Sequence, residues 1–286
     1  MHKSKVIFLT GTALFAFAGN SILNRLALGS GAIDALSFSA LRLVSGAAVL
    51  LLILVVSRKS IRPVRGNWTG SAALLIYMVT FSLAYRQLAT GTGALILFAT
   101  VQIVMVGTAL VLGQRMRLLG WLGFSLAVTG FLLYILPGLQ SPSWQALGLM
   151  IVAGAGWAVY SLLGRKSTDP LLDTTGNFVR TLPFIPLLLA WPSTSISAMG
   201  AVLAIISGAL MSGIGYAIWY QALRQLSSIQ AAMSQLLVPV LAAIAGLIWL
   251  QEAIGAQLVL AGAMILGGIA MHALSSQTKD PAGVQK

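Results

Sequence analysis

The chain has 286 residues, of which 58% are hydrophobic and only 8% are charged, and its mean hydropathy is +0.94. Soluble domains carry charge on about 25% of their residues, so this composition excludes a soluble protein and indicates an integral membrane protein. The net charge of +12 would suit a nucleic-acid partner, but the distribution of the basic residues argues against one.

Apolar runs long enough to cross a bilayer as helices recur along the whole chain. Polar or Gly/Pro-rich stretches separate them, and the runs lack the alternation of a membrane β-barrel. We expect an all-α integral membrane protein whose ten transmembrane helices lie at about residues 5–24, 33–56, 68–88, 91–113, 117–136, 144–164, 172–191, 198–223, 228–250 and 254–274.

The basic residues predict the orientation of these helices. With the N-terminus in the cytosol, thirteen of the 17 Lys and Arg residues fall at cytoplasmic positions, and only Arg25 and Arg86 fall outside. This distribution follows the positive-inside rule. We therefore expect a multi-pass protein of the cell inner (plasma) membrane with both termini in the cytosol, and no nucleic-acid partner.

Few residues could hold a metal or a nucleotide. The chain has no cysteine, and His2 and His272 lie at the expected membrane edges, so thiolate and histidine metal sites are not expected. No P-loop of the form GxxxxGK[ST] occurs. We expect neither a metal site nor a cofactor.

The second half of the chain repeats the polar landmarks of the first half. An offset of 138 residues places Arg42 on Arg180 and Arg86 on Arg224. Five helices per half would invert the second half relative to the first, and inverted repeats are typical of secondary transporters with a midplane substrate site. The predicted units are two inverted five-helix repeats, residues 1–138 and 139–276, and a cytoplasmic tail, residues 277–286.

The stretch AAMSQLLVPVLAAIAGLIWLQEAIGAQLVLAGAMILGGIAM, residues 231–271, resembles the end of an EamA repeat of the drug/metabolite transporter superfamily. Pro239 and Glu252 occupy the proline and glutamate positions of that repeat, whereas the first half has Val101 and Gln114 there. The resemblance implies a transporter of small organic solutes that often exports amino acids or other metabolites.

Two arginines lie within predicted helices, near the bilayer midplane. Arg42 and Arg180 would each cost at least about 2.5–3.5 kcal/mol if they faced lipid, so both should face the bundle interior. Each could contact an anionic group such as a substrate carboxylate. The alternative, which the recurrence of similar arginines in EamA repeats favours, is a structural arginine that ties its helix to neighbouring carbonyls.

Aromatic and amide side chains are the other candidates for substrate binding. Phe17, Asn20 and Asn24 share one helical face, which an offset of 140 places on Trp157, Tyr160 and Gly164. The alternative for each polar side chain is an interhelical hydrogen bond. Further intramembrane candidates are Gln102, Asn177, Tyr216, Tyr220 and Gln235.

None of the five carboxylates lies at mid-membrane depth in this assignment, which argues against proton coupling through an acidic side chain. We expect an alternating-access secondary transporter, an exporter of small polar or amphipathic metabolites such as amino acids. A carrier of drugs or lipid-linked sugars is the alternative, and a membrane-embedded enzyme would need a catalytic constellation that the helices lack. The expected partners are a small-molecule substrate and the lipid bilayer, with monomer and homodimer both open.

Overall fold

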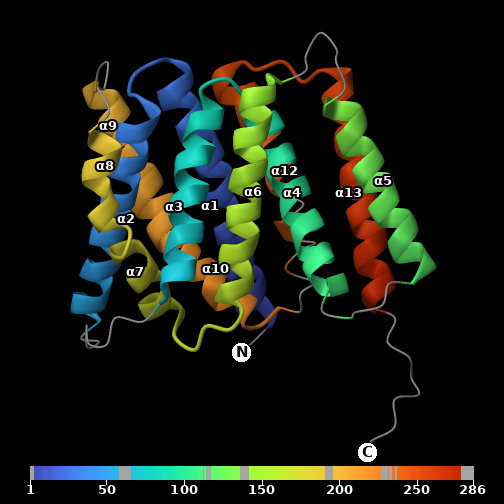
Figure 1. Cartoon of the computed structure of the whole chain (residues 1–286), viewed down its shortest axis with the longest axis horizontal. Coiled ribbons are helices and arrows are strands. Elements are labelled where there is room, and N and C mark those ends of the chain that lie inside the picture. Colours follow the sequence, from blue (N-terminus) through green and yellow to red (C-terminus); the bar gives the residue numbers. More distant parts are fainter. Residues whose placement is uncertain are drawn as a thin grey trace, which may run out of the picture.

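A computed structural model describes residues 3–57, 66–111, 113, 117–135, 142–190, 196–226, 231, 234–235 and 237–277. The first half of this described part forms five helices: α1 (Lys3–Gly29), α2 (Ala35–Val56), α3 (Trp68–Tyr85), α4 (Thr90–Val111) and α5 (Leu118–Ile135) (Figure 1). Asp34 and Asn67 cap α2 and α3 by accepting hydrogen bonds from the first free amides of each helix.

The second half contains five further segments, and three of them are interrupted or partly outside the described residues. These segments are α6 (Trp144–Gly164); α7 (Pro170–Val179), a 3-10 turn η1 (Leu182–Phe184) and α8 (Ile185–Leu189); α9 (Ala198–Ile206), a π-helix η2 (Ser207–Ile214) and α10 (Gly215–Leu223); α12 (Leu237–Leu250); and α13 (Ala256–Gln277). The predicted all-α fold with ten membrane segments is confirmed for the described residues.

Length and composition support membrane crossing. In the part of the chain that the structure describes, six helices are long and apolar enough to span a bilayer, and three shorter apolar helices accompany them. The ends of α1 and α13 that lead to the two termini lie at the same face of the bundle (Figure 1). We call the opposite face, where α1 ends at Gly29, the far face.

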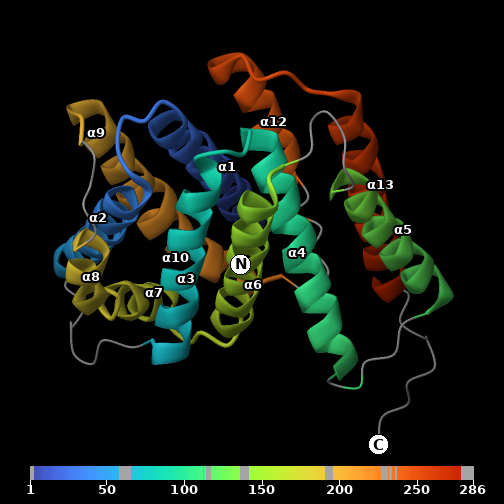
Figure 2. The same ribbon diagram turned by 45° about the horizontal axis from the view of Figure 1, so that its top comes forward.

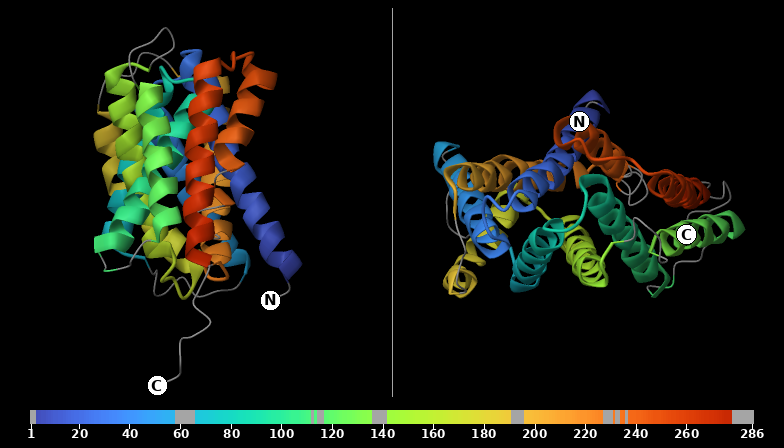
Figure 3. Two further views of the ribbon diagram at one scale, coloured as in Figure 1. Left: turned by 90° about the vertical axis from the view of Figure 1, so that its right-hand side faces the viewer. Right: turned by 90° about the horizontal axis from the view of Figure 1, so that it is seen from above.

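The helices stand in two rows, which Figure 3 shows from above. One row contains α10, α1, α12 and α13, and the other contains α3, α6, α4 and α5. If the ten predicted segments are numbered in chain order, the first row contains segments 8, 1, 9 and 10 and the second contains segments 3, 6, 4 and 5. Each segment of the first row therefore lies opposite the segment of the second row whose number differs by five. This order is expected for two repeats related by a two-fold axis, although the repeat boundaries stay a prediction.

Predicted segment 172–191 is a broken helix. Its first part, α7, lies across the upright helices, and α8 continues beside α2 (Figure 2). The break follows from Pro183, which cannot donate a backbone hydrogen bond and whose ring clashes with the preceding turn. Pro186 lies in the first turn of α8, where the missing donor has no cost.

The π-helix η2 packs very closely against α2. A Cβ atom added to Gly208 would lie 2.7 Å from the Cα of Arg42, and one added to Gly213 would lie 3.0 Å from the carbonyl oxygen of Gly46. Glycine therefore permits the two backbones to touch at both positions. Because π-helices are rare and occur frequently at functional sites, the side chains beside this contact are candidates for a functional site.

Candidate functional site

Aromatic rings from four helices meet between the two rows. Phe17 of α1 lies edge-on to Trp157 of α6 at 5.0 Å between ring centroids, and Trp157 lies 4.8 Å from Tyr216 of α10 and 5.1 Å from Tyr77 of α3. All four residues are buried. We call Phe17, Tyr77, Trp157 and Tyr216 the aromatic cluster.

Two pairs within the aromatic cluster join equivalent positions of the predicted repeats. Phe17 and Trp157 are 140 residues apart, which is the offset that aligns their helices. Tyr77 and Tyr216 are 139 residues apart, and the hydroxyl of Tyr216 donates a hydrogen bond to that of Tyr77 at 3.0 Å. Equivalent residues can touch only near an axis that relates the two halves, so the cluster lies where a midplane site is expected.

Asn20 connects the aromatic cluster to the π-helix. Its amide nitrogen donates to the hydroxyl of Tyr216 at 3.3 Å, and its carbonyl oxygen accepts from the hydroxyls of Ser207 at 2.7 Å and Ser212 at 3.2 Å. Its side chain is almost completely buried. One amide therefore links α1, η2 and α10.

Arg42 of α2 joins the same hydrogen-bond network. Its Nε donates to the Ser212 hydroxyl at 2.9 Å, and its Nη2 donates to the hydroxyls of Tyr216 at 2.8 Å and Tyr77 at 3.5 Å. Its guanidinium carbon lies 5.3 Å from the ring centroid of Phe81 and 5.6 Å from that of Tyr77, within the range of cation–π contacts.

Other predicted residues surround this centre. Asn24 donates to the backbone oxygen of Asn20 at 2.8 Å and accepts from Ser82 at 2.9 Å. The indole nitrogen of Trp157 donates to the Oε1 of Gln235 at 3.1 Å. Remaining candidates in contact are Tyr160 and Tyr220, whose rings lie 4.9 Å apart and which are joined by a hydrogen bond from the Tyr220 hydroxyl to the Tyr160 carbonyl.

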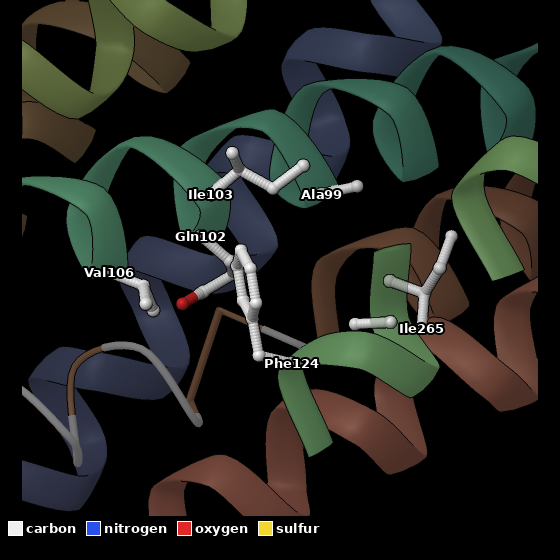
Figure 4. A pocket seen from close by; sticks show the side chains of 7 residues that line it. Ala99, Gln102, Ile103, Val106, Phe124 and Ile265 are labelled. Carbon is white, nitrogen blue, oxygen red and sulfur yellow. The ribbon is translucent and has the colours of Figure 1, made fainter. Parts of the chain in front are cut away.

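Gln102 and Arg180 make their described contacts elsewhere, and Asn177 lies beside Tyr160 at the edge of the centre. Gln102 lines a small pocket between α4, α5 and α13, where its side chain lies beside Phe124 (Figure 4). The Asn177 side chain accepts a hydrogen bond from the backbone amide of Asn67 at 3.0 Å, next to the start of α3. Arg180 is partly exposed at the end of α7 and donates to Gly176 of its own helix. Arg42 and Arg180 thus occupy different environments, despite their equivalent positions in the sequence.

The pocket beside Gln102 is small. Its volume is about 20 Å³, which is enough for about one water molecule. It therefore offers no space for an organic solute.

Sequence reasoning missed several residues of the centre. Tyr77 carries a signal that could have found it, because an offset of 139 places it on Tyr216. Ser207 and Ser212 carry none, because serine is common in membrane helices and only the π-helix turns both toward Asn20. The other missed residues are Phe81, Ser82, Phe178 and Trp219.

An ion pair joins three parts of the chain at the far face. The Nε of Arg25 donates to the Oε1 of Glu252 at 2.9 Å, and the Oε2 of Glu252 accepts from the backbone amide of Thr90 at 2.7 Å. Arg25 also donates to the carbonyl oxygen of Arg86 at 3.4 Å. These bonds hold together the end of α1, the turn between α3 and α4, and the turn between α12 and α13.

A separate apolar groove runs beside α1. It has a volume of about 570 Å³ and is bordered by α1, η2, α10 and α12. Gly19, Met211 and the exposed Trp249 are among the residues that line it. Its lining has almost no polar surface, unlike the network around Asn20.

Comparisons with known proteins identify the family. The EamA-like transporter family matches residues 144–274. An uncharacterized protein of Pseudomonas aeruginosa is 46% identical over 273 residues, covering 95% of each chain. The uncharacterized transporter YoaV of Bacillus subtilis is 25% identical, covering 84% of this chain and 87% of its own.

Two more distant similarities concern an exporter and a fold. A probable terminal-alkyne amino-acid exporter of Streptantibioticus cattleyicolor is 26% identical, covering 69% of this chain and 70% of its own. A solved crystal structure superposes with a TM-score of 0.71 at 17% identity, covering 99% of this chain and 100% of the other, which shows the fold alone. The chain therefore belongs to the EamA-like transporter family of the drug/metabolite transporter superfamily and is a multi-pass membrane transporter.

Proposed function

We propose that the chain is an alternating-access exporter of small polar or amphipathic metabolites, with amino acids as the leading class. The observation that carries the proposal is the centre formed by the aromatic cluster, Asn20 and Arg42. The aromatic rings can pack against the apolar part of a solute, and the amide, hydroxyls and guanidinium can form hydrogen bonds with its polar end. The name of the exporter relative from Streptantibioticus cattleyicolor adds support for an amino-acid substrate.

The orientation proposed for the cell follows from the basic residues. We place the chain in the inner membrane with the termini in the cytosol, because Arg117, Arg165, Lys166 and Arg224 belong to the turns at the terminal face. The far face is then external, and the proposal assigns its closure to the ion pair between Arg25 and Glu252. A centre sealed from outside by an ion pair would receive its solute from the cytosol, as export requires.

A flux assay tests the proposed function. The purified protein in liposomes would be preloaded with an unlabelled solute, and entry of the same labelled solute would be followed for amino acids, nucleobases and cationic drugs. We expect counterflow for at least one amino acid above that of protein-free liposomes. Counterflow restricted to drugs or nucleobases would overturn the amino-acid assignment, and no counterflow for any class would overturn the transporter assignment to this chain.

The apolar groove favours one alternative substrate class. A drug or lipid-linked sugar could lay its hydrocarbon part between α1 and α12, where the groove has a volume of about 570 Å³. Ala245 lines the groove and is mostly buried, so Ala245→Trp would fill part of it. Loss of counterflow for a hydrophobic drug, with amino-acid counterflow unchanged, would assign the groove to such solutes.

A further inference from the structure

Arg42 is the only buried charged side chain in the part of the chain that the structure describes, and none of its surface is exposed. Burying an ion is costly unless an opposite charge or several hydrogen bonds compensate for it. Arg42 therefore requires either a counter-ion or a full set of hydrogen-bond acceptors.

The carboxylates of the described residues do not compensate Arg42. Only one salt bridge is found among the described residues, that of Arg25 with Glu252. The other described carboxylates accept from nearby amides or hydroxyls, and Asp280 lies outside the described residues. Their partners are Leu36 and Ser37 for Asp34, Leu172 for Asp169, and Gly66 and Ser167 for Asp173.

Hydrogen bonds compensate Arg42 only in part. Its Nε and Nη2 donate to hydroxyls, but its buried Nη1 has no acceptor among the described residues. The hydroxyls of Tyr77 and Tyr216 accept from Nη2 and bond to each other. Only one of the two hydroxyl protons can lie between the two oxygens. The other hydroxyl proton can therefore be donated to a further acceptor.

The network therefore holds more donors than acceptors and a net positive charge. A carboxylate would supply the missing acceptors and neutralise the charge. It can accept two parallel N–H hydrogen bonds from a guanidinium and a further hydrogen bond from a hydroxyl. A cationic group would add like charge to Arg42 and would find no carboxylate there. The adjoining rings of Phe17 and Trp157 lie where the organic part of such a solute would extend.

We propose that Arg42, with the hydroxyls of Tyr77 and Tyr216, forms an anion-binding subsite that recognises the carboxylate of the transported solute. This inference rests on the proposed function and narrows it to solutes with a free carboxylate. Asn20 and Ser212 position the subsite, because they bond to Tyr216 and to the Nε of Arg42. The subsite would open as the two rows move apart during alternating access.

A series of related probes tests the subsite in the wild-type protein. The probes are L-phenylalanine, 3-phenylpropionate, L-phenylalanine methyl ester and phenethylamine, so that the ring is constant while the carboxylate is present, blocked or absent. Binding is read as a rise in the unfolding temperature of the purified protein, and transport as competition with amino-acid counterflow. We expect the two carboxylates to bind at least about tenfold more tightly than the ester and the amine.

Variants assign that preference to Arg42. Arg42→Lys keeps the charge but loses the paired N–H donors, and we expect it to weaken carboxylate binding about tenfold. Arg42→Met should bind acid and ester equally. The control is Arg224→Gln, which removes an exposed arginine at the end of α10 and should keep the wild-type preference.

The outcomes separate this inference from the proposed function. If the ester and the amine bind and compete as well as the acids, the proposed transport function is retained and the proposed anion-binding subsite is wrong. If Arg42→Met keeps the preference for acids, the subsite also falls. If Arg42→Met does not fold, Arg42→Lys and the wild-type probe series decide. If no probe binds and no amino acid moves, both proposals fall together.

Discussion

The hydroxyl oxygens of Tyr77 and Tyr216 lie 3.0 Å apart, although the two residues are 139 positions apart in the chain. The same separation, within one residue, relates Phe17 to Trp157, whose rings also touch. Both pairs join positions that the predicted repeats would make equivalent, so the centre lies where the two predicted repeats would meet. A solute held there could be reached from either face by a similar movement of either half.

The two tyrosines should differ in importance. Both substitutions remove the bond between the two hydroxyls. Tyr216→Phe also removes the acceptor shared by Arg42 and Asn20, whereas Tyr77→Phe also removes only the longer of the two bonds from the Nη2 of Arg42. We expect Tyr216→Phe to destabilise the protein by about 1–3 kcal/mol, because it leaves buried donors unpaired. Tyr77→Phe should cost less. Thermal unfolding in detergent measures both, and an equal or reversed order would contradict the assigned bonds.

Asn20 and Trp157 should matter for flux more than for folding. Asn20→Ala removes the amide that joins Tyr216 to Ser207, and Trp157→Ala removes the ring at the middle of the aromatic cluster. We expect each to lower amino-acid counterflow at least about tenfold with folded yield preserved, since one good polar or aromatic contact is equivalent to about 1–2 kcal/mol. Unchanged counterflow in both variants would show that the transported solute does not bind at this centre.

The close contact of η2 with α2 should tolerate no side chain. Gly208→Ala places a methyl group against the backbone of Arg42, which we expect to cost about 1–3 kcal/mol of stability and to disturb the Arg42 network. Gly262→Ala is the matched control, because a Cβ atom there has no neighbour within 4 Å. Thermal unfolding of the two variants should diverge, and equal stability would show that the helices separate easily.

The Arg25–Glu252 pair should hold the far face closed. Both side chains are partly shielded, with 27% and 15% of their surface exposed, so the pair contributes about 1 kcal/mol. The chain has no native cysteine, and Leu88→Cys introduces a single thiol at a position that is only 2% exposed near the far face. We expect Glu252→Gln to raise the alkylation rate of this thiol about fivefold. An unchanged alkylation rate would show that the ion pair does not hold the far face closed.

Transport should not require a proton gradient. The described carboxylates are engaged at helix starts, in turns and in the ion pair, and none belongs to the network around Arg42. We expect counterflow in liposomes to proceed at the same rate with and without a pH gradient across the membrane. Counterflow that appears only with the gradient would require a proton carrier elsewhere in the chain.

The sequence allowed the membrane class and the ten segments to be predicted, but not the contacts between the helices. Hydrophobicity and helix length determine the segments, and the repeat offset predicted that Phe17 and Trp157 occupy equivalent positions. The different environments of Arg42 and Arg180 could not be predicted, because the break at Pro183 moves Arg180 to a helix end. The π-helix depends on backbone contacts that glycine permits, which no periodic pattern reveals.

The central claim is that the transported solute binds between the two rows, beside Asn20. Ser207 is fully buried and donates to Asn20, so Ser207→Cys introduces a thiol of similar size as the only cysteine of the chain. Ser30→Cys introduces an exposed thiol on the far face as the control. Alkylation of both would be measured in liposomes with increasing concentrations of the amino acid that shows counterflow. We predict that the solute slows alkylation at position 207 at least about threefold and leaves position 30 unaffected. Equal alkylation of Ser207→Cys with and without saturating solute would contradict binding at this centre.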